Sequence, residues 1–195
     1  CKEIGKIPVS MGVDTWGVDF VLMDKDDKVL GNTVGYRDHR NEGMDEEVYK
    51  TISLEDLYAR TGIQKAIFNT VYQLMAVKTK HPEYLEQAET MLHVPDYFHY
   101  LLTGKKTCEY TEATTGQLVN AETKDWDYEL IDKLGYPRKM FQKLIMPGTS
   151  VGHFTEEVKA EVGFDVEVVA PATHDTGSAV LAVPANDDDF IYISS

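Results

Sequence analysis

The stretch VVAPATHDTGSAVLA, residues 168–182, decides how the fold is interpreted. Valine and alanine at its start predict a strand, the residues from His174 to Gly177 predict a turn, and the small residues that follow predict a helix. Asp175 is the one acidic side chain of the stretch, and it falls at the turn. Open α/β sheets bind ligands where the carboxyl end of a strand passes into a helix. The stretch therefore predicts an α/β fold with a carboxylate at a binding crevice.

Two roles are open for Asp175 from these residues alone. The carboxylate could cap the helix that begins near Thr176, because free N–H groups and the helix dipole favour negative charge there. It could instead act as a base that accepts a proton from a substrate hydroxyl. The residue pattern does not decide between these roles.

His174 and the nearby nucleophiles are open to several interpretations. The imidazole could orient a polar substrate, be buried against a backbone carbonyl, or bind a metal. No HxxxH and no paired Cys/His spacing accompanies it, so we expect no zinc site. Ser178 is not in a GxSxG elbow and Cys108 has no local histidine, so we do not expect a nucleophilic hydrolase.

A second polar cluster is GVDTWGVDF, residues 12–20. A glycine such as Gly17 lets the backbone approach another group closely. Trp16 could stack on a sugar face or fill the core, and Asp19 could bind hydroxyls or close a hairpin. All three are candidate substrate contacts.

A third cluster is YRDHR, residues 36–40, which follows a predicted strand. Its charged residues form either a surface ion-pair network or the rim of a polar ligand site. Under the second interpretation Arg37 contacts the substrate.

The predicted elements run in the order strands, helical block, strands. Neighbouring antiparallel strands are expected over 7–14, 17–24 and 29–36, with a turn at 25–28. Helices are expected between 44 and 104, including 81–92 and 95–104, and again over 125–135 and 155–163. Strands are expected at 165–172 and 190–195. Within the block, Ser53 and Asp56 have the spacing of a capping box, and a core-facing stripe is formed by Ile67, Val71, Leu74 and Val77.

Composition limits the classes of function. The chain has 195 residues, 43% hydrophobic and 27% charged, with a formal net charge of −14. Nucleic-acid binding needs clustered Lys and Arg, and a membrane helix needs about 20 apolar residues, so neither partner is expected. Cys1 and Cys108 form no metal or disulfide spacing, which favours free thiols and a cytoplasmic setting.

The chain resembles the FGGY family of carbohydrate kinases. The resemblance rests on GVDTWGVDFVLMD, YRDHR, GIQ with FNTVYQL, VPDYFHYLLTG, EYTEATTGQLVN, WDYELIDKLG, ATHDTGSAV and YISS, in this order. It implies an actin-like ATPase (ribonuclease H-like) fold, with a mixed sheet and an inserted helical block. It also implies that residues 1–195 are part of the N-terminal, sugar-binding domain. The phosphate-loop hairpin and the ATP-binding domain of the family are then expected to be absent from this chain.

The resemblance implies ATP- and Mg²⁺-dependent phosphorylation of a ketose, with L-rhamnulose expected from DTWGVDF together with THDT. Asp175 is the implied general base, and His174, Thr176 and Gly17 are implied to contact the sugar. No residue for ATP or a metal is expected in this chain, which should not turn over alone. Residues 65–67, KAI, depart from the family pattern, so L-fuculose or L-xylulose is an alternative substrate, and a non-catalytic sugar-binding module is an alternative function.

Overall fold

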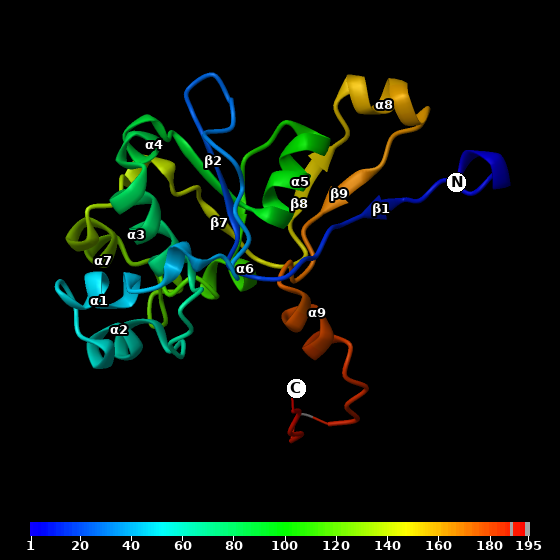
Figure 1. Ribbon diagram of the computed structural model, residues 1–195. Helices are drawn as coiled ribbons and strands as arrows, with labels where there is room; N and C mark the ends of the chain where they lie inside the picture. The colour runs from blue at the N-terminus through cyan, green and yellow to red at the C-terminus, as the bar shows by residue number, and fades with distance from the viewer. Residues whose placement is uncertain (188, 194–195) are drawn as a thin grey trace.

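The computed structural model describes residues 1–187 and 189–193, and its elements form two groups with helix α9 outside both (Figure 1). The longer helices are α1 (Met44–Tyr49), α2 (Leu54–Thr61), α3 (Thr70–Lys80), α4 (Pro82–Gln87), α5 (Val94–Thr103), α6 (Tyr110–Thr114), α7 (Tyr128–Leu134), α8 (Glu156–Val162) and α9 (Asp175–Leu181). Short 3-10 turns are η1 (Lys2–Ile4), η2 (His39–Asn41) and η3 (Arg138–Met140). Helices α1 to α4 and α7 form the helical block, while α5 and α8 lie beside a small sheet (Figure 1).

The strands are short and belong to four small sheets among the described residues. They are β1 (Ser10–Met11), β2 (Phe20–Met23), β3 (Thr90–His93), β4 (Cys108–Glu109), β5 (Val119–Asn120), β6 (Asp125–Trp126), β7 (Leu144–Ile145), β8 (Ser150–His153) and β9 (Glu167–Val169). The sheets are β1–β9–β8, β2–β3, β4–β7 and β5–β6. The predicted mixed α/β class is confirmed, but the strands do not form one continuous sheet.

The quoted stretch forms the predicted strand, turn and helix. Strand β9 lies at the centre of a mixed sheet, parallel to β1 and antiparallel to β8. Val168 is fully buried there and packs in a small core with Val151, Phe154 and Val166. The chain then turns and begins α9 at Asp175.

Strand pairing differs from the predicted antiparallel meander. Strand β1 pairs with β9, near the other end of the chain, and β2 pairs antiparallel with β3. Residues 29–36 contribute one bridge, between Val29 and Met23. The turn at 25–28 is confirmed, because the Asp24 N–H donates to the Lys28 carbonyl at 2.9 Å. Partners this far apart in sequence leave no local signal, so the prediction was wrong for β1.

The predicted helix over residues 81–92 is also shorter than expected. Helix α4 ends at Gln87, and Thr90–His93 forms strand β3, in which every residue is buried. A strand that is buried on both faces shows no alternation, so its apolar run looks like the end of a helix.

The main core lies in the helical block, where α3 is buried along most of its length. Val71 and Leu74 are fully buried and Val77 is nearly so, whereas Ile67 is 40% exposed and precedes the helix. Each fully buried aliphatic side chain stabilises the fold by about 1.5–3 kcal/mol. The predicted cap is confirmed at Ser53, whose Oγ accepts the Asp56 N–H at 3.1 Å.

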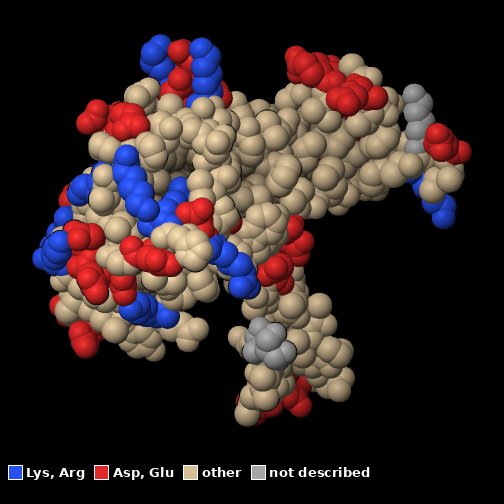
Figure 2. All heavy atoms as spheres, in the orientation of Figure 1, with Lys and Arg blue, Asp and Glu red and all other residues tan. Residues whose placement is uncertain are grey.

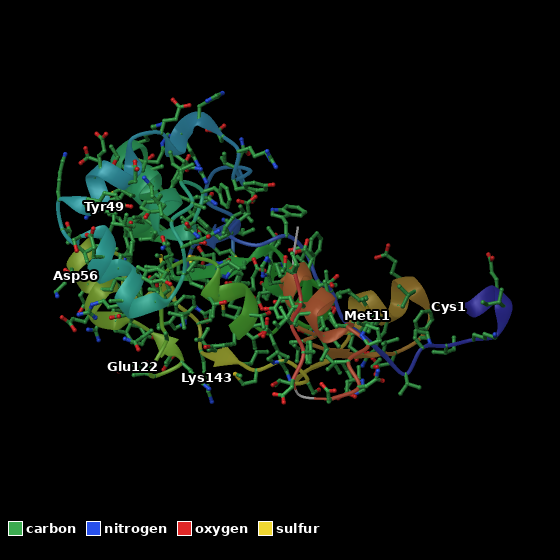
Figure 3. All side chains as sticks on the ribbon, turned by 90° about the horizontal axis from the view of Figure 1, so that it is seen from below. Cys1, Met11, Tyr49, Asp56, Glu122 and Lys143 are labelled. Atoms are coloured by element: carbon green, nitrogen blue, oxygen red, sulfur yellow. The ribbon has the colours of Figure 1, made fainter. Side chains whose placement is uncertain are left out.

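Helix α9 projects away from the rest of the molecule (Figures 1 and 2). Residues 190–193 form no strand, and residues 194–195 of the predicted strand lie outside the described residues. Ile191 is 95% exposed. Figure 3 shows Cys1 at one end of the molecule, and Tyr49 and Asp56 of the helical block at the other. Within the described residues, no helix is both long and apolar enough to cross a lipid bilayer.

Candidate functional site

The turn from Thr173 to Asp175 is held by hydrogen bonds on two sides. The Thr15 N–H donates to the Thr173 carbonyl at 2.9 Å, and the Asp175 N–H donates to the Thr15 carbonyl at 2.8 Å. On the other side, the Thr173 N–H donates to the Glu109 carboxylate at 3.0 Å. The backbone of this turn is therefore fixed by the fold itself.

Asp175 is the first residue of α9 and is not its N-cap residue. The N-cap position belongs to His174, whose side chain makes no capping hydrogen bond. Oδ1 of Asp175 accepts the adjacent Thr176 N–H at 2.6 Å, and no partner for Oδ2 is found among the described residues. The Asp175 side chain is 57% exposed. One carboxylate oxygen is therefore available to a ligand.

Opposite this turn, the chain bends sharply at Gly17 and Val18. The Asp19 N–H donates to the Gly17 carbonyl at 3.0 Å, across Val18 with φ 73°. This is the pattern of a γ-turn in the left-handed region, which a β-branched residue rarely adopts. Thr115 Oγ1 accepts the Val18 N–H at 3.1 Å. A Cβ atom at position 17 would lie 2.9 Å from Thr115 Cγ2, so this close approach requires glycine.

Trp16 is oriented by a buried carboxylate. Its side chain is 48% exposed, and its Nε1–H donates to Asp19 Oδ2 at 2.9 Å. The same oxygen accepts the Tyr36 N–H at 3.1 Å, and Oδ1 accepts Gln73 Nε2–H at 3.0 Å. Because Asp19 is 2% exposed, its carboxylate fixes Trp16 and Tyr36 and is not presented to solvent.

These segments enclose a pocket of about 390 Å³. Trp16, Gly17, His174 and Asp175, all predicted site residues, line it together. In Figure 2 the surface is hollowed between the helical block and the start of α9, which supply part of this lining. The volume and the mixture of aromatic and hydrogen-bonding groups suit a small polar ligand.

The other predicted contacts lie outside this pocket. Asp19 and Arg37 line an adjoining shallow hollow that shares Trp16 and Tyr36 with it. Arg37 stacks over the Tyr36 ring at 5.1 Å, and its Nε–H donates to Tyr36 Oη at 3.1 Å. Thr176 lines a separate small hollow within the C-terminal segment.

Several lining residues were not predicted. They are Val18, Tyr36, Ile63, Gln64, Ala66, Phe68, Asn69, Thr114 and Thr115. Most of them fall in the blocks GIQ, FNTVYQL and EYTEATTGQLVN, which were noted only for their family resemblance. Asn69 joins two of these blocks, because its Nδ2–H donates to the Thr115 carbonyl at 2.7 Å.

His174 lies at the edge of the pocket, where burial favours its neutral form. Burial lowers its pKa, while the charges of Asp175 and Glu109 partly oppose this shift. Its Nε2 atom lies 3.6 Å from Asp175 Oδ1. A neutral imidazole offers one donor and one acceptor, which matches the hydroxyl groups of a polyol.

One group of side chains among the described residues could supply metal ligands. The ligand atoms of His93, Asp96 and Cys108 lie within 4.8 Å of one another, and all three residues are buried. Burial raises the pKa of Asp96 to about 8, lowers that of His93 to about 4, and raises that of Cys108. At neutral pH the group is therefore predominantly uncharged, and none of its members lines the pocket.

The pocket itself does not match a dedicated Mg²⁺ site. Such a site needs several oxygen ligands in octahedral geometry. Asp175 is the one carboxylate among the described residues that line the pocket. The described residues that line the pocket therefore offer an acceptor group but no set of carboxylate ligands for this ion.

Residues 4–182 match the N-terminal domain of the FGGY family of carbohydrate kinases. The chain is 56% identical over 195 residues to a rhamnulokinase of Halalkalibacterium halodurans, covering 100% of the chain and 42% of that protein. It is 53% identical over 191 residues to a rhamnulokinase of Oceanobacillus iheyensis, covering 98% of the chain and 40% of that protein. The chain thus spans less than half the length of these relatives.

Solved structures of sugar kinases share the fold. A ligand-bound xylulose kinase from Lactobacillus acidophilus aligns with a TM-score of 0.81 at 21% identity, over 89% of this chain and 36% of that one. A glycerol kinase from Plasmodium falciparum, solved with ADP, aligns with a TM-score of 0.71 at 15% identity, over 84% of this chain and 34% of that one. The fold is therefore the actin-like ATPase fold of sugar kinases, as the resemblance implied. Together with the match over residues 4–182, this places the chain in the FGGY family of carbohydrate kinases.

Proposed function

We propose that this chain forms the acceptor-sugar site of an ATP-dependent kinase that converts L-rhamnulose to L-rhamnulose 1-phosphate, a step of L-rhamnose breakdown. The observation that carries the proposal is Asp175, an exposed carboxylate with a free oxygen on a fixed turn at the pocket. The identity of 56% to a rhamnulokinase supports L-rhamnulose as the acceptor.

In the proposed reaction Asp175 is the general base. The acceptor hydroxyl donates to Oδ2, and its oxygen attacks the γ-phosphorus of ATP in line with the leaving group. As the new P–O bond forms, the bond to the β–γ bridging oxygen breaks, the proton passes to Asp175, and ADP leaves. A positioned base of this kind contributes about 10²–10⁴-fold to the rate.

Two neighbours orient the sugar in this proposal. The exposed face of Trp16, held by Asp19, stacks on the carbon face of the ketose. Neutral His174 donates to or accepts from a second hydroxyl. Gly17 lets this wall of the pocket pack closely against Thr115, because no side chain projects from position 17.

Mg²⁺, when bound with ATP, neutralises charge on the transferring phosphate. The residues that line the pocket include no set of carboxylates for this ion. We therefore propose that ATP and Mg²⁺ bind mainly to the part of such a kinase that this chain, at 42% of its relative's length, does not cover. Use of ATP and the buried free thiol of Cys108 support a cytoplasmic setting.

A coupled ATPase assay on the full-length protein with a panel of ketoses tests the proposal. We expect the highest kcat/KM with L-rhamnulose, and phosphate on the 1-hydroxyl of the product by NMR. A preference for L-fuculose or L-xylulose would refute the assigned substrate and leave the kinase chemistry standing. Sugar binding without any ketose-stimulated turnover would favour a non-catalytic sugar-binding module.

A further inference from the structure

We infer that Glu109 is a positioning residue that holds Thr173 from behind the pocket and thereby sets Asp175 against the acceptor hydroxyl. The inference rests on the proposed role of Asp175 as base. Glu109 ends β4, is fully buried, and is not among the residues that line the pocket. It therefore acts through the turn and not on the sugar.

The Glu109 carboxylate is surrounded by hydrogen-bond donors. Oε1 accepts the Thr111 N–H at 2.9 Å. Oε2 accepts the Thr111 hydroxyl, the Glu112 N–H at 3.3 Å, the Thr173 N–H at 3.0 Å and the Thr173 hydroxyl at 2.8 Å. A buried carboxylate is costly unless its oxygens are satisfied, and these donors satisfy both of them.

Only some of the hydrogen bonds to the Glu109 carboxylate cap helix α6, which begins at the next residue. The bonds to Thr111 and Glu112 cap the start of α6, and they would be sufficient for that purpose. The two bonds to Thr173 are additional, since Thr173 lies on the segment that leads into α9. They connect the end of β4 directly to the turn that carries Asp175.

Glu109 and Thr15 hold the turn from opposite sides. The Thr173 N–H donates to Glu109, while the Thr173 carbonyl accepts from the Thr15 N–H at 2.9 Å. Thr111, which Glu109 orients, accepts the His174 N–H at 3.3 Å. Loss of the Glu109 contacts would release one side of the turn. A displacement of about 1 Å at a reacting group can cost about 10²-fold in rate.

A carboxylate is the group that this position requires. Every neighbour that bonds to the Glu109 carboxylate does so as a donor. Glutamine would keep one acceptor oxygen and turn an NH₂ group toward these donors, with little change in volume. Glu109→Gln therefore weakens the contacts to Thr173, because it removes the negative charge that strengthens these hydrogen bonds, while leaving the packing almost unchanged.

The test measures ketose phosphorylation by the full-length protein. For Glu109→Gln we expect kcat to fall by about 10- to 100-fold while the KM for L-rhamnulose stays within about threefold, because the sugar contacts remain. In an Asp175→Asn background the same change should lower kcat by no more than about twofold, because the two residues act as one unit. Glu122→Gln, on an exposed glutamate, is the matched control.

A second pair of variants covers the case in which Glu109→Gln does not fold. Thr173→Val removes the hydroxyl bond to Oε2 and should lower kcat by about tenfold, and Thr173→Ser should restore it. Equal kcat values for wild type, Glu109→Gln and Thr173→Val, with only the melting temperature lowered, would overturn the positioning role. If Asp175→Asn itself retains activity, the proposed role of Asp175 as general base fails; if only the Glu109 and Thr173 variants retain it, the positioning role of Glu109 fails alone.

Discussion

At the scale of single residues, Gly17 packs closely against Thr115 at the pocket. A Cβ atom at position 17 would lie 2.9 Å from Thr115 Cγ2. For Gly17→Ala we expect a loss of about 1–3 kcal/mol in the free energy of unfolding, because the γ-turn must move. Urea unfolding checks this, with Gly35→Ala as the control, since nothing lies within 4 Å of a Cβ there. An equal effect of both changes would contradict the packing argument.

Trp16 gives an optical signal for sugar binding. It is 48% exposed, whereas Trp126 is 4% exposed and lies in the main core. A sugar stacked on Trp16 excludes water from the indole, so its emission should shift to shorter wavelength. In the full-length protein, Trp16→Phe should abolish that shift and Trp126→Phe should leave it. A shift that survives Trp16→Phe would place the sugar elsewhere.

The residues of the site were predictable to different degrees. Asp175, His174, Gly17 and Trp16 were predicted as candidates because polar, aromatic or glycine residues stood out against apolar strands, and the family resemblance implied roles for the first three. The structure brings all four to one pocket. The sequence does not reveal that Asp19 is buried and holds Trp16 in place. The other oxygen of its carboxylate accepts from Gln73, which comes from the distant helix α3. Side-chain partners of this kind depend on tertiary contacts.

At the scale of elements, the first turn of helix α5 carries a buried titratable group, Asp96. Asp96 has its pKa raised from 3.8 to about 8 by burial. Between these values the folded state holds a proton that the unfolded state has lost, so the free energy of unfolding falls as pH rises. The pKa of His93 is lowered from 6.5 to about 4, so its opposite effect lies below pH 6.5.

We therefore expect the free energy of unfolding to decrease between pH 6.5 and 8, with Asp96 contributing up to about 1.4 kcal/mol per pH unit. Asp96→Asn should flatten this slope, and part of it should remain because burial also raises the pKa of Glu112. Asp26→Asn, on an exposed aspartate, is the control. An unchanged slope in Asp96→Asn would show that Asp96 is ionised in the folded protein.

The elements show where local sequence patterns stop being informative. Helices with caps were predicted well, as at Ser53 for α2 and over residues 95–104 for α5, which ends at Thr103 with Gly104 as its left-handed C-cap. The pairing of β1 and the existence of β3 were not predicted, because these strands pair with β9 and β2, which are distant segments of the chain. Residues 190–193, predicted as a strand, form none and have no paired strand among the described residues.

At the scale of the whole molecule, the pocket is open toward solvent beside α9 (Figure 2). The chain covers 42% of a rhamnulokinase relative, so we expect residues 1–195 expressed alone to show no ketose-dependent ATP turnover. Circular dichroism would establish that the polypeptide is folded, and the coupled assay would measure turnover. Turnover by residues 1–195 would contradict the placement of the nucleotide site outside this chain.

In the proposed reaction, Asp175 removes the proton from the acceptor hydroxyl. The most direct test is kcat for L-rhamnulose in the full-length protein with Asp175→Asn, beside Asp26→Asn, because the two side chains are similarly exposed at 57% and 55%. We predict that kcat falls by about 10²–10⁴-fold in Asp175→Asn, with sugar binding retained and Asp26→Asn unchanged. A loss of only a few-fold in Asp175→Asn would contradict the assignment of Asp175 as the general base.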